Sequence, residues 1–574
     1  MRKLHYPGLG ILLSAACFAM PFSQHQSSNP AATHCAKDDS GLTLPSGFCA
    51  TVFVDGIGHA RHLAVSKNGT VYVNTWSGAY FGNDKPHGGG FVVALRDTQG
   101  SGHADVVRRF GQTVQGGGAG GTGIALYRGF VYAEINDRIE RYAIHDDTVL
   151  VHGLAEVVVK GLPLGGDHPM HPFVIDAKGN LYVDVASATN SCQVTNRTLE
   201  SPGIVPCTEL ETRGGIWKFN ADKLNQAFSP AKRYATGIRN ADGIALDAGG
   251  RQVYATQHGR DQLGQNWPKL YTPEQGAILP SEVLLKVTHG ADFGWPECYF
   301  DPLQGKLVLA PEYGGDGGRK VGDCANKQGP VAAFPAHWGP NDLLIYSGAQ
   351  FPTHYRNGAF IAFHGSWNRA PFPQGGFNVV FQGLANGAAS GKCEIFATGF
   401  AGHRPTGLAM GPDGTLYIAD DVQGRVYRVV YEGGDFDADK TTPCPSLDAD
   451  PGEPVASAAA NRSLTADLPV PAGSSKEALL LGDRIYHGQV GGAACTGCHG
   501  ADAGGTLLGP SLKSNTWIWN DGSLGGLTKI ISTGVATPSN YRTAMPPMGG
   551  AQLSPEQVSA VAAYVWGLSQ SASR

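Results

Sequence analysis

The chain has no block of basic residues, and beyond its first thirty residues it has no run of about 18 apolar residues that could span a membrane. Its 574 residues carry a formal net charge of −5, which excludes the basic surface of a nucleic-acid-binding protein. The lack of long apolar runs predicts a soluble mature protein without a transmembrane helix. Hydrophobic residues nevertheless make up 42% of the chain, so a substantial core is available and global disorder is excluded.

The N-terminus has the pattern of a secretory signal peptide. Arg2 and Lys3 precede an apolar run over residues 9–20, and polar residues follow. A positive start with a short apolar centre is typical of a cleaved signal. We therefore expect residues 1–30 to be a signal peptide and the mature protein to be periplasmic or secreted.

Cysteine usage also indicates an oxidising compartment. Of the eleven cysteines, Cys17 lies in the signal and two belong to a motif discussed below. The other eight are Cys35, Cys49, Cys192, Cys207, Cys298, Cys324, Cys393 and Cys444. Their order favours four pairs of sequence neighbours, although eight cysteines allow about a hundred connectivities.

A hairpin unit recurs between about residues 51 and 431. An apolar triplet is followed by a glycine-containing turn and then by a strand with alternating apolar residues. The copies begin at Leu63, Ile124, Phe173, Ile244 and Leu408, and a looser copy surrounds residues 358–363. Six units of this kind predict an all-β, six-bladed β-propeller. One or two β-sandwiches are the alternative, but a sandwich does not require the same hairpin to return in the same phase.

The pattern changes after the last copy. We expect the propeller to occupy residues 31–432 and a Pro/Ala/Asp-rich linker to occupy residues 433–475. Residues 476–574 then show helical spacing. Their last helix is expected to begin at Ser554-Pro555-Glu556-Gln557, where serine and glutamine form a capping box.

The C-terminal part contains Cys495-Thr496-Gly497-Cys498-His499. Two cysteines three apart and followed by histidine are typical of covalent haem c attachment, with the histidine as an axial ligand of the iron. A zinc half-site, a redox dithiol or a chance match are the alternatives.

The segment around this motif resembles a small all-α class I cytochrome c domain over nearly all of its length. The family pattern places the sixth iron ligand before a Pro-Pro pair, which implies Met545 in preference to Met548. Pro510 matches the proline whose carbonyl oxygen accepts a hydrogen bond from the ligand histidine. A haem iron with both axial positions filled carries electrons and does not catalyse alone.

The repeat phase gives candidate site residues. In a propeller the loops that enter the inner strands face one central funnel, so the residues before each triplet should share a cavity. These residues include Arg61, His62, His168, His171, Arg239, His403 and Arg404. Converging cations would repel one another unless an anionic ligand lay between them, and arginine suits planar carboxylates. The alternative is that the arginines pair with Asp242, Asp420 or Asp421.

The propeller resembles the soluble sugar dehydrogenases that use pyrroloquinoline quinone (PQQ), especially the sorbosone and pyranose dehydrogenases. The motifs that carry the resemblance are Asp167-His168, Gly237-Ile238-Arg239-Asn240-Ala241-Asp242-Gly243, Gln257-His258-Gly259, Asp292-Phe293-Gly294-Trp295-Pro296, His364-Gly365-Ser366-Trp367-Asn368-Arg369 and His403-Arg404-Pro405-Thr406-Gly407. Together they cover most of residues 50–431.

The resemblance implies a role for individual residues. His168 matches the general base, and Asp167 is expected to orient it. Arg239, Asn240, Arg404 and, from the funnel pattern, Arg61 are expected to hold PQQ, and Arg369 stands where the family has a lysine near the quinone carbonyls. Calcium is expected at Gly259, Arg260 and Asp261. The chain departs from the family at His258, which replaces a glutamine, and at residues 116–121, where another glutamine is absent. Both departures leave the identity of the substrate open.

These features predict a quinohaemoprotein. A sugar or sugar aldehyde would transfer hydride to PQQ, and electrons would pass to haem c and on to an external acceptor, either a soluble cytochrome or a quinone-linked chain. A propeller lactonase or other hydrolase, or a carbohydrate-binding module that delivers the cytochrome domain, are the alternatives. A hydrolase leaves the fused haem without a role.

Overall fold

We analysed a computed structural model. It describes residue 35 and residues 38–571, apart from residues 78–86, 113–119, 145–148, 150, 370, 401–402, 435, 453–467, 489, 491–492, 494, 501–502, 506–508, 515, 536–537, 539–540, 542–544 and 552. The predicted signal peptide lies outside the described residues. Among the helices in the described part of the chain, none combines the length and the apolar character needed to cross a bilayer.

The first three blades are antiparallel sheets built from consecutive strands. Blade 1 contains β2 (His59–Val65), β3 (Val71–Trp76), β4 (Val92–Arg96) and β5 (Val106–Phe110). Blade 2 contains β6 (Ile124–Tyr127), β7 (Phe130–Ile135), β8 (Arg138–Ile144) and β9 (Val151–Lys160), with β13 (Gln226–Ala227) added in parallel at its edge. Blade 3 contains β10 (Phe173–Ile175), β11 (Asn180–Val185), β12 (Gly215–Asn220) and β14 (Arg233–Thr236).

The last three blades follow the same plan, and the final one closes the ring. Blade 4 contains β15 (Ile244–Leu246), β16 (Val253–Gln257), β17 (Glu282–Val287) and β20 (Ala332–Phe334). Blade 5 contains β21 (Pro340–Ile345), β22 (Ala359–Phe363), β23 (Asn378–Gln382) and β26 (Glu394–Ala397), with β30 (Thr442–Pro443) at its edge. Blade 6 contains β27 (Pro405–Met410), β28 (Leu416–Asp420) and β29 (Arg425–Tyr431), and its outer strand is β1 (Phe48–Val54) from the start of the fold.

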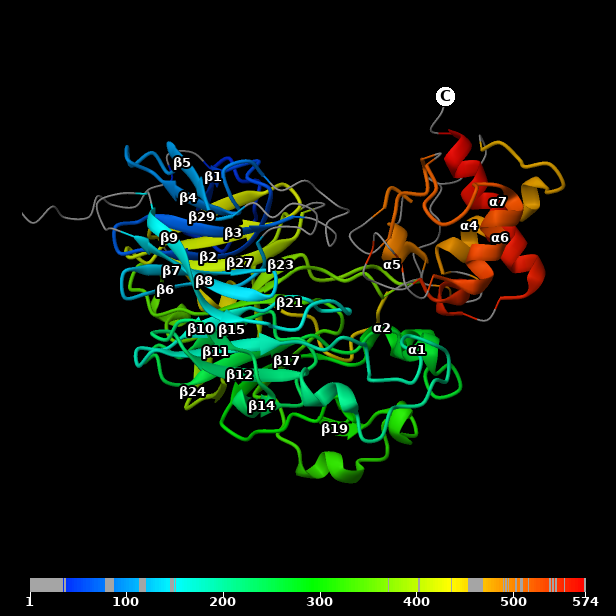
Figure 1. Ribbon diagram of the computed structural model, residues 1–574, viewed down its shortest axis with the longest axis horizontal. Helices are drawn as coiled ribbons and strands as arrows, with labels where there is room; N and C mark the ends of the chain where they lie inside the picture. The colour runs from blue at the N-terminus through cyan, green and yellow to red at the C-terminus, as the bar shows by residue number, and fades with distance from the viewer. Residues whose placement is uncertain are drawn as a thin grey trace, which may run out of the picture.

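The first strands of the blades form the inner ring. Each of them contacts the first strand of the next blade, and β27 contacts β2. Six apolar clusters fill the spaces between neighbouring blades. The cluster between blades 6 and 1 joins Tyr417 and Val426 to Val73 and also includes Phe53 from β1. The predicted six-bladed propeller is therefore confirmed (Figure 1).

Five of the six predicted hairpins begin a blade at the predicted triplet. The looser copy at residues 358–363 is the second strand of its blade, β22, and not the start of a unit. The inner strand of blade 5 is β21, whose Leu343, Leu344 and Ile345 are the missing triplet. A loop of thirteen residues separates it from β22, where the other copies have a short turn.

Shorter elements decorate the loops. They are α1 (Leu263–Asn266), α2 (Pro273–Ile278), the hairpins of β18 (Cys298–Asp301) with β19 (Lys306–Leu309) and β24 (Leu384–Ala385) with β25 (Ala388–Ala389), and the 3-10 helices η2 (Thr208–Glu211), η3 (Pro230–Lys232), η4 (Pro311–Tyr313), η5 (Gly322–Asn326), η6 (Thr353–Tyr355) and η7 (Ala438–Lys440).

Four disulfides join the propeller cysteines in sequence order, as predicted. They are Cys35–Cys49, Cys192–Cys207, Cys298–Cys324 and Cys393–Cys444. The last of them fastens the segment after β29 back onto blade 5. Cys495 and Cys498 take part in none of these bonds.

The C-terminal domain is helical, as predicted, and in Figure 1 it forms the orange and red part of the chain. Its elements are α4 (Lys476–Tyr486), α5 (Cys495–His499), α6 (Leu524–Thr533), η8 (Pro547–Gly550) and α7 (Pro555–Ser571). The helices α4 and α7 cross closely at Gly482, where a Cβ atom would collide with the carbonyl oxygen of Ala560. The predicted capping box opens α7, because Ser554 N donates to Gln557 Oε1 (2.8 Å) and Gln557 N donates to Ser554 Oγ (3.3 Å).

Candidate functional site

A cavity of about 430 Å³ occupies the centre of the propeller at one end of the inner ring. Its polar and charged lining residues are His59, Asp167, His168, Arg197, Arg239, Asn240, Asp242, His258, Asp261, Glu282, His337, Asn341, His364, Asn368, Arg404 and Asp421. The structure thus brings together six of the sequence-predicted residues, Asp167, His168, Arg239, Asn240, Asp261 and Arg404, and also the backbone of Gly259.

The antiparallel order of the strands explains this lining. The start of a first strand and the end of a second strand lie at the same end of a blade. His258 follows β16, His364 follows β22 and Asp421 follows β28, so each enters the funnel from the end of a second strand. The predicted entry loops therefore form only part of the funnel wall. The segments that follow the second strands form another part.

His168 is held as a neutral base. Its Nδ1 lies 2.9 Å from the carbonyl oxygen of Ser187, which can only accept, so Nδ1 carries the proton. Ser187 Oγ, 3.0 Å from the same nitrogen, itself donates to the carbonyl oxygen of Thr189. Burial, and after it the charge of Arg239, lowers the pKa of His168 well below its ordinary value. Nε2 is therefore the unprotonated nitrogen, which can accept a proton from a ligand in the cavity.

Asp167 does not orient His168, contrary to the expectation from the sequence. Its carboxylate is ion-paired with Arg197, whose Nε donates to Asp167 Oδ2 at 2.9 Å, and Asn196 lies on its other side at 3.4 Å. The backbone and hydroxyl of Ser187 perform the orienting role instead.

Arg239 is anchored in the wall by four of its five N–H groups. Nε and Nη2 donate to Asn190, Nη1 donates to the carbonyl oxygen of Gly259 (2.9 Å), and Nη2 donates to Asp261 Oδ2 (2.7 Å). The predicted alternative of arginine–carboxylate pairing is thus realised for Arg239 with Asp261, and for Arg61 with the predicted partner Asp421. An anion in the cavity would meet a cation of fixed position.

Asn240 and Arg404 complete the predicted anion-binding set. Arg404 Nη1 contacts His364 Nδ1 at 3.2 Å and stacks over Phe377. Asn240 Oδ1 and His337 Nδ1 are buried in the cavity wall with no hydrogen-bond partner. Buried polar atoms of this kind are rarely left unsatisfied, and they fit a polar ligand between the walls. Both atoms are acceptors, because His337 Nε2 lies 2.9 Å from the carbonyl oxygen of Gly276 and so carries the proton. The arginines and the cavity therefore fit a compact, planar anion that also has a hydrogen-bond donor.

Two predicted cofactor-binding arginines do not line the cavity. Arg61 is 1% exposed and lies beneath the floor, where Nη1 is 2.8 Å from Asp421 Oδ2. Arg369 donates to the carbonyl oxygens of Pro373, Ala277 and Ala336. Arg61 therefore belongs to a buried ion pair, and Arg369 holds a loop through backbone carbonyl oxygens. Neither side chain lines the cavity.

The predicted calcium set does not fit a cation. Calcium takes six to eight oxygen ligands at about 2.3–2.6 Å. Here the Gly259 carbonyl oxygen and Asp261 Oδ2 each accept a hydrogen bond from Arg239, and the Arg260 guanidinium donates to the carbonyl oxygen of Asp261. A divalent ion bound to these oxygens would lie next to the guanidinium groups.

Two further carboxyl groups in the cavity wall have raised pKa values. Burial raises the pKa of Asp242 to about 7 and the pKa of Glu282 to about 8. Glu282 accepts hydrogen bonds from the backbone N–H groups of Gly259 and Gly339. It therefore shapes the loop that carries Gly259 while adding little negative charge to the funnel.

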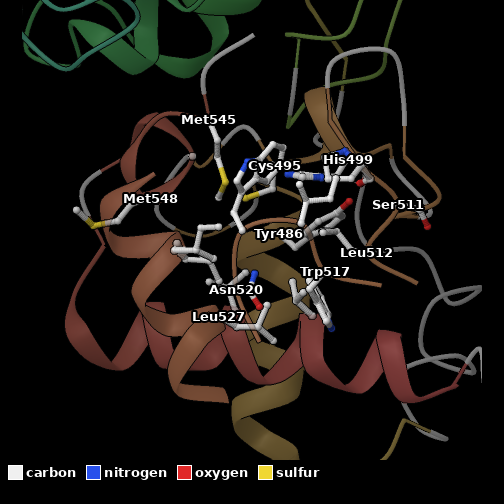
Figure 2. Close-up of a pocket in the computed structure, with 18 of the residues that line it drawn as sticks. Tyr486, Cys495, His499, Ser511, Leu512, Trp517, Asn520, Leu527, Met545 and Met548 are labelled. Carbon is white, nitrogen blue, oxygen red and sulfur yellow. The ribbon is translucent and has the colours of Figure 1, made fainter. Parts of the chain in front are cut away.

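The C-terminal domain contains a second, mainly apolar pocket between its helices. Cys495 and His499 line it from α5, together with Met545 and aromatic residues such as Trp517 (Figure 2). His499 Nδ1 lies 2.8 Å from the carbonyl oxygen of Pro510, as predicted, which leaves Nε2 for a metal. These residues fit a covalently bound haem, because the Cys495 thiol and an oriented imidazole line an apolar pocket, and Cys498 lies on the same short helix.

The two methionines differ in orientation. Figure 2 shows the sulfur of Met545 turned toward Cys495 and His499, whereas the sulfur of Met548 points away from them. Met545 is also fixed by a backbone pair with Val535, whose N–H donates to the Met545 carbonyl oxygen at 2.8 Å. Of the two methionines, Met545 is therefore the one turned toward the haem motif, and its role as the sixth ligand stays a prediction.

The haem pocket lies beside the funnel. Gly505, which follows the haem motif, forms part of the funnel lining. The loop that follows the haem motif therefore reaches the cavity.

Sequence reasoning missed Arg197, which joins Asp167 to Asp261. It lies in the loop closed by Cys192–Cys207, outside the repeated hairpins. His337 and Glu282 were missed as well, because the blade 5 triplet was not found and Glu282 lies in a third strand.

The fold and the two pockets define a β-propeller with a polar central site, fused to a cytochrome c domain. A family model described as TrAA12-like matches residues 42–432, and the chain belongs to this PQQ-dependent sugar dehydrogenase-like family. A second model, cytochrome c oxidase, cbb3-type, subunit III, matches residues 482–565.

Individual relatives agree with both halves. A pyrroloquinoline quinone-dependent pyranose dehydrogenase of Coprinopsis cinerea is 25% identical over 261 residues, 38% of this chain and 34% of that protein. The cbb3-type cytochrome c oxidase subunit FixP of Rhizobium etli is 37% identical over 82 residues, 14% of this chain and 28% of that protein. The chain spans about half or less of the curated relatives that it matches.

The propeller fold of this chain is similar to that of a solved structure. The PQQ domain of the Coprinopsis cinerea pyranose dehydrogenase superposes with a TM-score of 0.52 at 18% identity. The match covers 68% of this chain and 97% of that domain. The matches thus divide the chain into a propeller of the PQQ-dependent sugar dehydrogenase-like family and a cytochrome c domain.

Proposed function

We propose that the protein is a PQQ-dependent dehydrogenase that oxidises a sugar or sugar aldehyde and passes the electrons through haem c to an external acceptor. The acceptor is a soluble cytochrome or a quinone-linked chain. Dehydrogenation is assigned to residues 31–432 and electron transfer to residues 476–574, with residues 433–475 as the linker. A signal peptide over residues 1–30 would deliver the protein to the periplasm or the medium.

The single observation that carries this proposal is the position of His168. A neutral imidazole, fixed through Nδ1 to Ser187, lines a cavity that also contains anchored arginines. A base is useful for removing a proton from a hydroxyl group, and the arginines suit an anionic cofactor. A haem pocket beside that cavity provides a route for the electrons.

PQQ, when bound, supplies the electrophilic carbonyl that accepts hydride from the substrate carbon. Arg239, Arg404 and Asn240 would hold its carboxylates and carbonyl oxygens. His168 Nε2 would accept the proton of the substrate hydroxyl as the hydride departs. Substrates with an aldehyde or hemiacetal group would leave as acids or lactones.

The haem domain would then remove the electrons one at a time. His499 and Met545 would hold the haem iron, which would supply one-electron transfer and not oxygen chemistry. The apolar pocket around Trp517 and Leu527 would shield a bound haem from water.

Reconstitution tests the proposal. The haem-loaded protein, freed of PQQ, is mixed with PQQ and then with a panel of aldoses, ketoses and sugar aldehydes, and the haem absorption is followed. We expect haem reduction that requires both PQQ and a sugar. A complete lack of sugar-dependent reduction across the panel, with dithionite still reducing the haem, would refute the proposed function.

A further inference from the structure

The wall of the funnel that contains Gly259 and Asp261 is a cluster of three arginines and three carboxylates. Arg197 bridges Asp167 and Asp261 at 2.9 Å each, and Arg239 lies 2.7 Å from Asp261. The third pair, Arg260 with Glu312 at 2.5 Å, is buried directly behind them. The positive and negative charges of this cluster are equal in number.

Asp261 is the centre of the cluster, and both of its carboxylate oxygens accept hydrogen bonds from protein groups. Oδ2 accepts from Arg197 and Arg239, and Oδ1 accepts from Asn368 at 2.8 Å. Burial works to raise the pKa of Asp261, but the charges of Arg239 and Arg197 outweigh it and hold that pKa below its usual range. The carboxylate is ionised and already neutralised by protein groups.

The backbone is shaped to deliver Arg197 to this position. Arg197 has a φ of +56°, in the left-handed region that residues with a Cβ atom rarely adopt. Its loop is closed by the Cys192–Cys207 disulfide, and its N–H donates to Gln193 Oε1 at 3.0 Å. Strain of this kind persists where surrounding structure enforces it, and it concentrates at functional sites.

We infer that the guanidinium groups of Arg197 and Arg239 take the place of a divalent cation in this wall, so that the cofactor binds without calcium. This inference rests on the proposed function. The oxygens of Gly259 and Asp261 that would ligate an ion are occupied by donors of fixed position. A planar cofactor carrying carboxylates would instead face two guanidinium charges of fixed position, and one N–H group of Arg239 remains to donate a charge-assisted hydrogen bond.

The test is the affinity for PQQ with and without calcium. The full-length haem-loaded protein is freed of PQQ and of metal ions, and PQQ binding is measured by ultrafiltration in excess EGTA and in excess calcium chloride. We expect dissociation constants that agree within about twofold. An ion that belonged to the site would change the apparent affinity about 100-fold at a hundred times its own dissociation constant.

The outcomes separate the inference from the proposed function. Binding with the same affinity in both buffers supports the inference. Binding that is at least about tenfold tighter with calcium overturns it and leaves the proposed function intact. Binding in neither buffer overturns both. Elemental analysis of the protein reconstituted in calcium chloride gives a second readout, and stoichiometric calcium that resists EGTA would also overturn the inference.

A variant tests the role of Arg197 directly. Arg197→Met leaves the carboxylates of Asp167 and Asp261 facing each other, so we expect PQQ affinity in EGTA to fall at least about tenfold. Arg213→Met is the control, because Arg213 is also buried but donates to the carbonyl oxygens of Ala186 and Leu164 outside the cavity. Unchanged affinity in Arg197→Met would overturn the inference. If that variant does not fold, the comparison of buffers on the natural chain still decides.

Discussion

The Nδ1 atom of His168 lies 2.9 Å from the carbonyl oxygen of Ser187, and this contact sets the tautomer of the imidazole. Because a carbonyl oxygen can only accept, the proton resides on Nδ1 and Nε2 is the basic atom. The two residues come from different loops of blade 3, before β10 and after β11. The hairpin itself therefore brings the base and the group that orients it together.

Replacement of His168 should abolish sugar oxidation without affecting the haem. We expect His168→Ala to lower the rate of sugar-dependent haem reduction by about 10²–10⁴-fold, the usual contribution of a general base. The spectrum of the dithionite-reduced haem should remain normal. His103→Ala, a change on the outer side of blade 1, is the control. Turnover at the natural rate in His168→Ala would contradict the assignment of the base.

The activity should persist in mildly acidic solution. Burial and the charges of Arg239 and Arg197 disfavour the imidazolium form of His168 and lower its pKa well below the ordinary value of 6.5. The active neutral form thus remains populated as the pH falls through 6.5. We expect kcat/KM, measured with an artificial acceptor, to stay level there and to decline only at lower pH. An acidic limb centred at 6.5 would indicate an unperturbed histidine.

The fold could be predicted from the sequence where its signal is local. Turns between the first two strands of a blade are short at Val65–Val71 and Met410–Leu416, so both strands fall within one recognisable pattern. In blade 5 the same two strands are separated by a loop that contains η6, and the triplet at Leu343–Ile345 was overlooked. The closing pair of β1 with β29 joins the two ends of the propeller, and no local pattern encodes it.

The candidate site was predicted in part, for the same reason. Residues placed by the repeat, such as His168 and Arg239, could be found from their phase relative to the triplets. The arrangement of charges could not be predicted, because Arg197 contacts Asp167 and Asp261, which lie 30 and 64 residues away from it in the sequence. Arg61 follows the repeat phase as well, but a buried carboxylate, Asp421, holds it under the floor.

The disulfide at Cys192–Cys207 should support cofactor binding as well as stability. Replacing both cysteines by serine opens a loop of 15 residues and should lower the free energy of unfolding by about 3 kcal/mol. Since this loop holds Arg197 in a left-handed conformation, we also expect weaker PQQ binding. Urea unfolding and ultrafiltration with PQQ measure the two effects.

The Cys393–Cys444 pair is the matched control for that experiment. It closes a longer loop, of 51 residues, and lies at the edge of blade 5, away from the funnel. Its removal should cost about 2–4 kcal/mol of stability and leave PQQ affinity unchanged. Equal losses of affinity in both double variants would show that stability alone, and not the position of Arg197, governs the effect.

The two methionines offer a direct test of haem ligation. The Met545 sulfur points toward Cys495 and His499, while the Met548 sulfur points away (Figure 2). Met545→Leu removes the sixth ligand, so we expect the reduction potential to fall by about a few tenths of a volt, within the roughly 0.8 V range that axial ligands set. Met548→Leu removes a side chain of the same size and should leave the potential unchanged. Potentiometric titration of the haem spectrum measures both, and a shift confined to Met548→Leu would reverse the assignment.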